Sequence, residues 1–154
     1  MSGLIFTHPG SLMVGTVVKT LTVYPYEGKS LSEVVHRGVY HSHDRDIYHK
    51  FAGIEVALVE PATVNLVQFD KYPYYEELLV WVDAQKPIMP KHLFGIGIQY
   101  PEEQCHAPIA EIGSMLGNKG SVLCIGGHAG WRYLNCYPVQ SSWDIGHLFG
   151  FLSE

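Results

Sequence analysis

The sequence predicts a mainly β protein, an antiparallel β-barrel or sandwich with one or two short helices, and an α+β fold is the alternative. Short apolar runs separated by Gly, Pro and Asp recur along the chain, a pattern typical of strands joined by tight turns. Ten Tyr, three Trp and sixteen Gly favour strands over a helical bundle. Only 16% of the residues are charged, below the roughly 25% of a typical soluble domain. We therefore expect a homo-oligomer that covers part of this surface.

Eight segments have the composition and periodicity of strands. They are residues 16–24, 35–43, 54–60, 63–69, 78–82, 94–100, 121–125 and 132–137. In FGIGIQY, residues 94–100, large side chains alternate with Gly and Gln, so we expect a neighbouring group to approach closely over the glycines. The runs LLVWV and VLCI are apolar on both faces, which predicts central strands or strands at an interface.

Two segments predict helices. In KSLSEVV, Ser30 stands three positions before Glu33, the spacing of a helix capping box. In APIAEIGSMLG, Pro108 suits the first helical turn, apolar residues recur at spacings of three and four, and Gly117 suits the position just after a helix. We expect the second of these helices to be the longer one.

Length and charge restrict the organisation of the chain and its partners. With 154 residues and no linker-like tract, residues 1–154 are expected to form a single domain. A formal net charge of −5 and scattered basic residues argue against binding to nucleic acid or an anionic membrane. The three cysteines have no CxxC spacing, and the first residues lack the features of a signal peptide. We expect a cytoplasmic protein that acts on or binds a small-molecule ligand.

The stretch HSHDRDIYH, residues 41–49, is the strongest indication of chemistry. On an extended chain, His41 and His43 project to the same side, because side chains alternate along a strand. With the carboxylate of Asp46 they form part of a site for Fe, Mn, Ni or Zn, and another imidazole must come from elsewhere. The alternative is a polar turn that is rich in histidine. Taken alone, this motif favours the polar turn over the metal site.

A second segment, GIGIQYPEEQCH at residues 95–106, gives the metal hypothesis further support. The spacing of Gly95, Pro101 and His106, taken with the HxH pair, resembles the two metal-binding motifs of the cupin family. The resemblance implies a small β-barrel in which both motifs meet around a divalent metal ion. It implies as ligands His41, His43, Asp46 and His106.

The run from residue 107 to residue 135 resembles the C-terminal part of nucleoside 2-deoxyribosyltransferase-like proteins. This resemblance implies a helix that carries Glu111, followed by a strand and a Trp-Arg pair. Glu111 would then act as the nucleophile in glycosyl transfer, since a carboxylate can attack an anomeric carbon. A solvated glutamate on a helix is the alternative that the sequence favours.

Three functions therefore follow from the sequence. The leading hypothesis is a metal-dependent small-molecule enzyme or binding protein of cupin-like type. The second is a non-catalytic, self-assembling structural protein whose aromatic clusters, among them Tyr72, Tyr74 and Trp131, lie at subunit contacts. The third is glycosyl transfer through Glu111.

Overall fold

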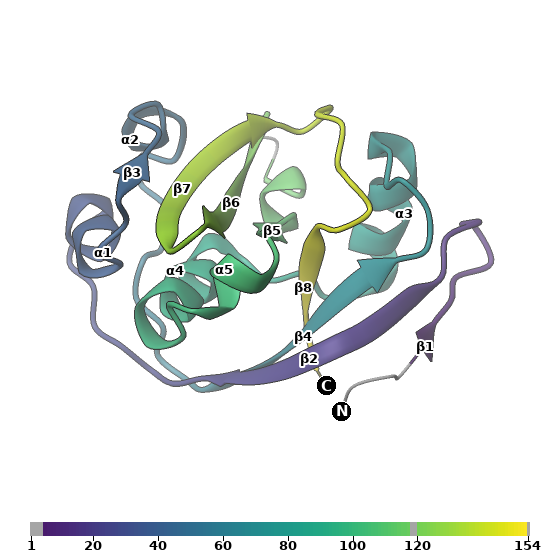
Figure 1. Ribbon diagram of the computed structural model, residues 1–154, viewed down its shortest axis with the longest axis horizontal. Coiled ribbons are helices and arrows are strands. Elements are labelled where there is room, and N and C mark those ends of the chain that lie inside the picture. Colours follow the sequence, from purple (N-terminus) through teal and green to yellow (C-terminus); the bar gives the residue numbers. More distant parts are fainter. Residues whose placement is uncertain (1–4, 118–119, 154) are drawn as a thin grey trace.

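The computed structural model describes residues 5–117 and 120–153, and these residues form an α+β fold built on one open, mixed sheet (Figure 1). The strands are β1 (Ile5–Phe6), β2 (Gly15–Val23), β3 (Ser42–His43), β4 (Ala62–Phe69), β5 (Ile109–Glu111), β6 (Ser121–His128), β7 (Trp131–Pro138) and β8 (Leu148–Leu152). The helices are α1 (Leu31–Arg37), α2 (Ile47–Lys50), α3 (Tyr75–Ala84), α4 (Pro90–Gln99) and α5 (Glu103–His106), with a 3₁₀ turn at Gly113–Met115. None of the described helices has the length and apolar character needed to cross a membrane.

The sheet has the strand order β1-β2-β4-β8-β5-β6-β7-β3, so the predicted closed barrel is wrong and the α+β alternative is correct. Closure of a barrel requires the two end strands to pair with each other. Here the ends are β1 and β3, which have two residues each and pair only with β2 and β7. The pairs β5–β8 and β3–β7 are parallel, and the remaining pairs are antiparallel.

Helices cover both faces of the sheet and create two separate cores. On one face, α4 packs its apolar side chains, including Leu93 and Ile96, against β2, β5 and β6. On the other face, α3 contributes Leu78, Trp81 and Val82 to a second cluster. Because both faces are covered, β6 is buried from residue 121 to residue 126, as its continuous apolar run predicts.

A β-bulge lets strand β2 contribute to both cores. Val17 pairs with Val67 and Lys19 pairs with Leu66, so Val18 is an extra residue with no partner on β4. Without a bulge, residues 17, 19 and 21 would face the same side. Instead Val17 enters the cluster beneath α3, while Leu21 joins the cluster beneath α4.

Four predicted strands and one predicted helix differ from the structure. LLVWV lies in α3, where the buried residues Leu78, Trp81 and Val82 recur at helical spacings. Residues 94–99 lie in α4, which is buried continuously from His92 to Gly97. Residues 35–43 divide between α1 and β3, and residues 54–60 form a single bridge at Leu58. The segment predicted as a helix from Pro108 is instead strand β5, which lies between β8 and β6, followed by the 3₁₀ turn.

The glycines of α4 allow the close approach that the sequence predicts, although on a helix. A side chain at Gly95 would collide with Val23 of β2, and a side chain at Gly97 would collide with the hydroxyl of Tyr40. Glycine is unfavourable inside a helix by roughly 0.5–1 kcal/mol relative to alanine. The fold tolerates this cost because the two surfaces pack directly against the helix backbone.

One buried arginine joins β7 to the helices on this face. The Arg132 guanidinium donates to the carbonyl oxygens of Val39, Gly97 and Pro101, and to the Gln104 side chain at 2.8 Å. The Val39 carbonyl follows α1, the Gly97 carbonyl lies in the last turn of α4, and the Pro101 carbonyl lies just beyond that helix. A cation is favoured at the end of a helix by the helix dipole. Arg132 therefore fixes the ends of two helices, and it has no carboxylate partner among residues 5–117 and 120–153.

Candidate functional site at the start of helix α4

His41 and His43 lie beside the beginning of β7, but their side chains have different partners. The His41 ring stacks on Trp131 with 4.8 Å between ring centroids, and its Nδ1 accepts a hydrogen bond from the Arg132 backbone N–H at 2.9 Å. The His43 ring contacts Tyr48, whose hydroxyl lies 3.2 Å from Nε2. The extended segment here is only two residues long, so it does not impose one common side on the two imidazoles.

Asp46 and His106, the other two predicted ligands, also have separate surroundings. Asp46 precedes α2, and its backbone N–H donates to the Asp44 side chain at 3.0 Å. His106 ends α5 and lines a cavity together with Val18 and Lys19 of β2. Within residues 5–117 and 120–153, no group of three or more His, Cys, Asp or Glu side chains is arranged to hold a metal ion. The divalent-metal site stays a prediction from the sequence.

Glu111 lies on a central strand and is fully buried. Its carboxyl group accepts hydrogen bonds from the Leu123 N–H at 3.0 Å and from both the N–H and the hydroxyl of Ser114. Burial raises the pKa of Glu111 to about 8, and these three hydrogen bonds oppose the rise. The side chain therefore ties the 3₁₀ turn to β6, in contrast to the solvated helical glutamate that the sequence favours.

Three adjoining cavities lie near the start of α4, and two of them are lined by residues of this helix. The first, of about 670 Å³, lies between residues 25–29 and residues 57–59. The second, of about 640 Å³, shares Leu58 and Val59 with the first and also reaches β8 at Leu152. The third, of about 320 Å³, shares Met89 and Lys91 with the second. We call this region the α4 groove, defined by Tyr26, Leu58, Val59, Met89, Lys91 and His92.

Two features of the sequence determine where α4 starts: Pro90, and the residue Ile88 that pairs with β8 just before it. Ile88 is buried, and its N–H donates to the Gly150 carbonyl of β8 at 3.0 Å. Pro90 then occupies the first helical position, where its missing N–H carries no penalty and its fixed φ favours the helix. The groove is thus built on a rigid junction between β8 and α4.

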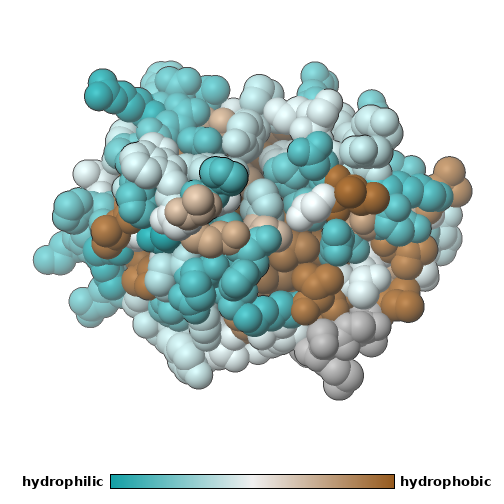
Figure 2. All heavy atoms as spheres, viewed as in Figure 1, coloured by the Kyte–Doolittle hydropathy of each residue, from teal (hydrophilic) through white to brown (hydrophobic). Residues whose placement is uncertain are grey.

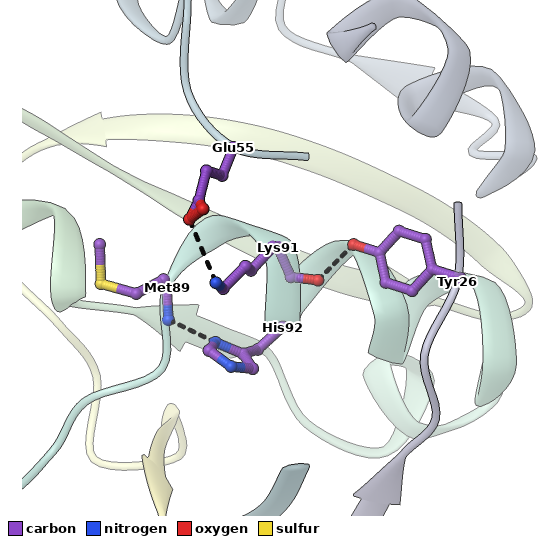
Figure 3. Close-up of polar contacts among 5 residues, drawn as sticks. All are labelled: Tyr26, Glu55, Met89, Lys91 and His92. Atoms are coloured by element: carbon purple, nitrogen blue, oxygen red, sulfur yellow. Dashed lines mark hydrogen bonds and ion pairs between the residues drawn. The ribbon is translucent and has the colours of Figure 1, made fainter. Parts of the chain in front are cut away.

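His92 closes the first turn of α4 by acting as a cap (Figure 3). Its Nδ1 accepts a hydrogen bond from the Met89 N–H at 2.9 Å, which is the role that Glu or Gln usually takes three residues after a helix cap. The side chain is only 5% exposed. Burial, together with the neighbouring Lys91 charge, lowers the pKa of His92 to about 4, so the ring is neutral at pH 7.

Tyr26, Lys91 and Glu55 complete the polar part of the groove (Figure 3). The Tyr26 hydroxyl donates to the Lys91 carbonyl, and burial raises the pKa of this phenol above its usual range. The Lys91 ammonium lies 3.2 Å from the Glu55 carboxylate, which is largely exposed. Exposed ion pairs of this kind contribute little to stability, but they compensate charge at the rim.

The sequence did not indicate His92 as a site residue. The reason is that the alternating pattern from residue 94 onward predicts a strand, and this conceals the start of the helix. The available signal is MPKH, with Pro90 suited to the first helical position and His92 two residues later. His92 is then recognisable as a cap, although its burial is not.

No family model, curated protein or solved structure matches the chain. The functional assignment therefore depends on the geometry of the α4 groove.

Proposed function

We propose that the protein binds a small, largely apolar molecule in the α4 groove. The observation that carries the proposal is the exposure of apolar side chains on the walls of the cavities. Val59 is 84% exposed and Met89 is 36% exposed, and both line the cavity that contains the buried His92. Concave sites with apolar walls, a few polar groups and volumes of roughly 300–1,000 Å³ are typical of small-molecule binding.

The proposed activity is binding, because the polar groups of the groove suit recognition. A histidine whose pKa is about 4 is a weak base at neutral pH. The Tyr26 hydroxyl is engaged with the Lys91 carbonyl, and the Lys91 ammonium is engaged with Glu55. The groove thus offers apolar contact area together with polar groups that are held in position.

A titration followed by amide NMR shifts tests this function, with α-tetralone as the probe. We expect shift changes at Leu58, Val59 and Met89, which line the groove. Val59→Lys should weaken binding by about tenfold, because it replaces exposed apolar contact area by a hydrated charge. Leu12→Lys, at an equally exposed apolar site elsewhere, is the control and should leave the affinity unchanged. Shift changes away from the groove, or none at all, would refute the proposal.

Self-association is a second candidate function, supported by another surface. Leu12, Tyr72 and Tyr74 are each more than half exposed. Lys71, which precedes Tyr72 in the chain, donates to the Leu12 carbonyl at 3.0 Å, so the segments that carry Leu12 and Tyr72 lie next to each other. Figure 2 shows apolar residues gathered at this end of the molecule, where β1 and α3 lie. Exposed aromatic clusters of this type occur at interfaces.

Sedimentation velocity tests the assembly proposal. We expect a homo-oligomer that dissociates in Leu12→Asp and in Tyr74→Glu, because each substitution places a charge in the contact. Val59→Lys is the matched control and should leave the sedimentation coefficient unchanged. A monomeric wild-type protein at high concentration would contradict self-assembly.

A further inference from the structure

The imidazole of His92 has one nitrogen committed to the fold and one nitrogen without a hydrogen bond to the described residues. Nδ1 accepts the Met89 N–H, so in the neutral ring the proton resides on Nε2. This assignment follows from the hydrogen bond, since a proton on Nδ1 would oppose the Met89 proton directly. Nε2–H is therefore a hydrogen-bond donor whose direction is fixed by the start of α4.

This donor has no partner among the described residues. His92 makes the single hydrogen bond to Met89, and in Figure 3 the opposite side of its ring faces away from Glu55. The ring is 95% buried, and it lines the cavity of about 640 Å³ that Leu58, Pro61 and Leu152 also line. Nε2 is not fully buried, so this N–H is open to the cavity, and an acceptor on a bound ligand would take the place of water as its partner.

The charges around the cavity favour a neutral acceptor over an anion. His92 is uncharged at pH 7, and Lys91 is compensated by Glu55. Glu60 is exposed at the rim of the same cavity and would repel a carboxylate. The rest of the wall is mainly apolar, which favours a ligand with a hydrocarbon body.

We propose that the α4 groove selects apolar molecules that carry a carbonyl group, and that His92 Nε2–H donates a hydrogen bond to that carbonyl. The proposal depends on the binding function stated above and specifies its ligand class. His92 is then a specificity-determining residue in addition to a helix cap. A site with a fixed donor discriminates against an analogue that lacks the acceptor, because the donor stays unpaired when that analogue is bound.

Two isosteric probes, α-tetralone and tetralin, separate this inference from the binding function itself. Both present the same fused ring, and only α-tetralone has a carbonyl. We expect α-tetralone to bind about tenfold more tightly than tetralin, the value of one net hydrogen bond of about 1.4 kcal/mol. Tetralin carboxylate should bind more weakly than α-tetralone, because the Glu60 carboxylate at the rim would repel its negative charge.

A matched pair of substitutions tests the role of His92 while the helix cap is retained. His92→Gln keeps an acceptor for the Met89 N–H and also keeps a donor, so the preference for α-tetralone should persist. His92→Glu keeps the acceptor but has no donor when ionised, so the preference should disappear. Thermal unfolding of both variants checks that the fold is intact.

The wild-type protein gives a readout that does not depend on any substitution. With ¹⁵N-labelled histidine, the Nε2 signal of His92 should shift on addition of α-tetralone and stay unchanged with tetralin. Equal affinity for the two probes, or a preference that survives in His92→Glu, would overturn the carbonyl inference while the binding function stands. Failure of both probes to bind would overturn the binding function and the inference together.

Discussion

His92 and Glu111 are buried titratable residues that respond to pH in opposite directions. The pKa of His92 is lowered from 6.5 to about 4, so its contribution to stability is present above pH 6.5 and is lost as the pH falls toward 4. The pKa of Glu111 is raised from 4.5 to about 8, so its contribution is present below pH 4.5 and is lost as the pH rises toward 8. At mildly acidic pH the two residues therefore change the free energy of unfolding in opposite directions as the pH rises.

Above pH 6.5 the contribution of His92 to the free energy of unfolding no longer changes with pH, whereas that of Glu111 still does. We predict that the free energy of unfolding decreases between pH 6.5 and pH 8, by up to about 1.4 kcal/mol per pH unit for one proton. Urea denaturation at several pH values in this interval measures the slope. Glu111→Gln should flatten it, because the titrating group is removed, whereas Glu102→Gln at an exposed position should not. An unchanged slope in Glu111→Gln would assign the pH dependence to other groups.

At the scale of single elements, α4 shows why alternation in sequence is an incomplete guide. Gly95 and Gly97 alternate with large apolar residues as in a strand, yet their spacing reflects two neighbours on different sides of a helix. Val23 and Tyr26 approach Gly95, and Tyr40 approaches Gly97. These neighbours come from distant segments, so local periodicity does not contain them. The Ser30 cap of α1, by contrast, is a local signal and is confirmed by its hydrogen bond from the Glu33 N–H at 3.1 Å.

The contact between Gly97 and Tyr40 gives a prediction at this scale. Gly97→Ala should destabilise the protein by about 1–3 kcal/mol through overpacking against the Tyr40 hydroxyl, although alanine favours helices. Tyr40→Phe removes that hydroxyl, which is buried without a hydrogen-bond partner among the described residues, so by itself it should be nearly neutral.

The double variant completes a thermodynamic cycle for this contact. Tyr40→Phe should recover part of the stability that Gly97→Ala loses, and chemical denaturation of the four proteins measures the coupling. Additive effects of the two substitutions would show that the close approach does not limit residue 97.

For the molecule as a whole, the sequence predicts most of the long strands but little of their arrangement. The strands β2, β4, β6 and β7 lie close to the predicted positions, because each is rich in β-branched, aromatic or other apolar residues and is bounded by turn residues. The order of the sheet depends on pairing between distant segments, such as β5 with β8, and no local signal encodes that choice. β8 itself was not predicted.

The candidate site illustrates the same limit. The predicted histidines of HSHDRDIYH lie on the surface, and the structure gives them separate partners. The α4 groove instead combines residues from three separate segments, among them Tyr26, Val59 and His92. Burial of His92 and exposure of Val59 are consequences of tertiary packing, so sequence reasoning had no means to join them.

A crystal structure of the protein with α-tetralone tests the central claim most directly. The predicted result is ligand density in the cavity between Leu58, Met89 and Leu152, with the carbonyl oxygen about 3 Å from His92 Nε2. Density at another site with this cavity empty, or a ligand carbonyl directed away from His92, would contradict the account.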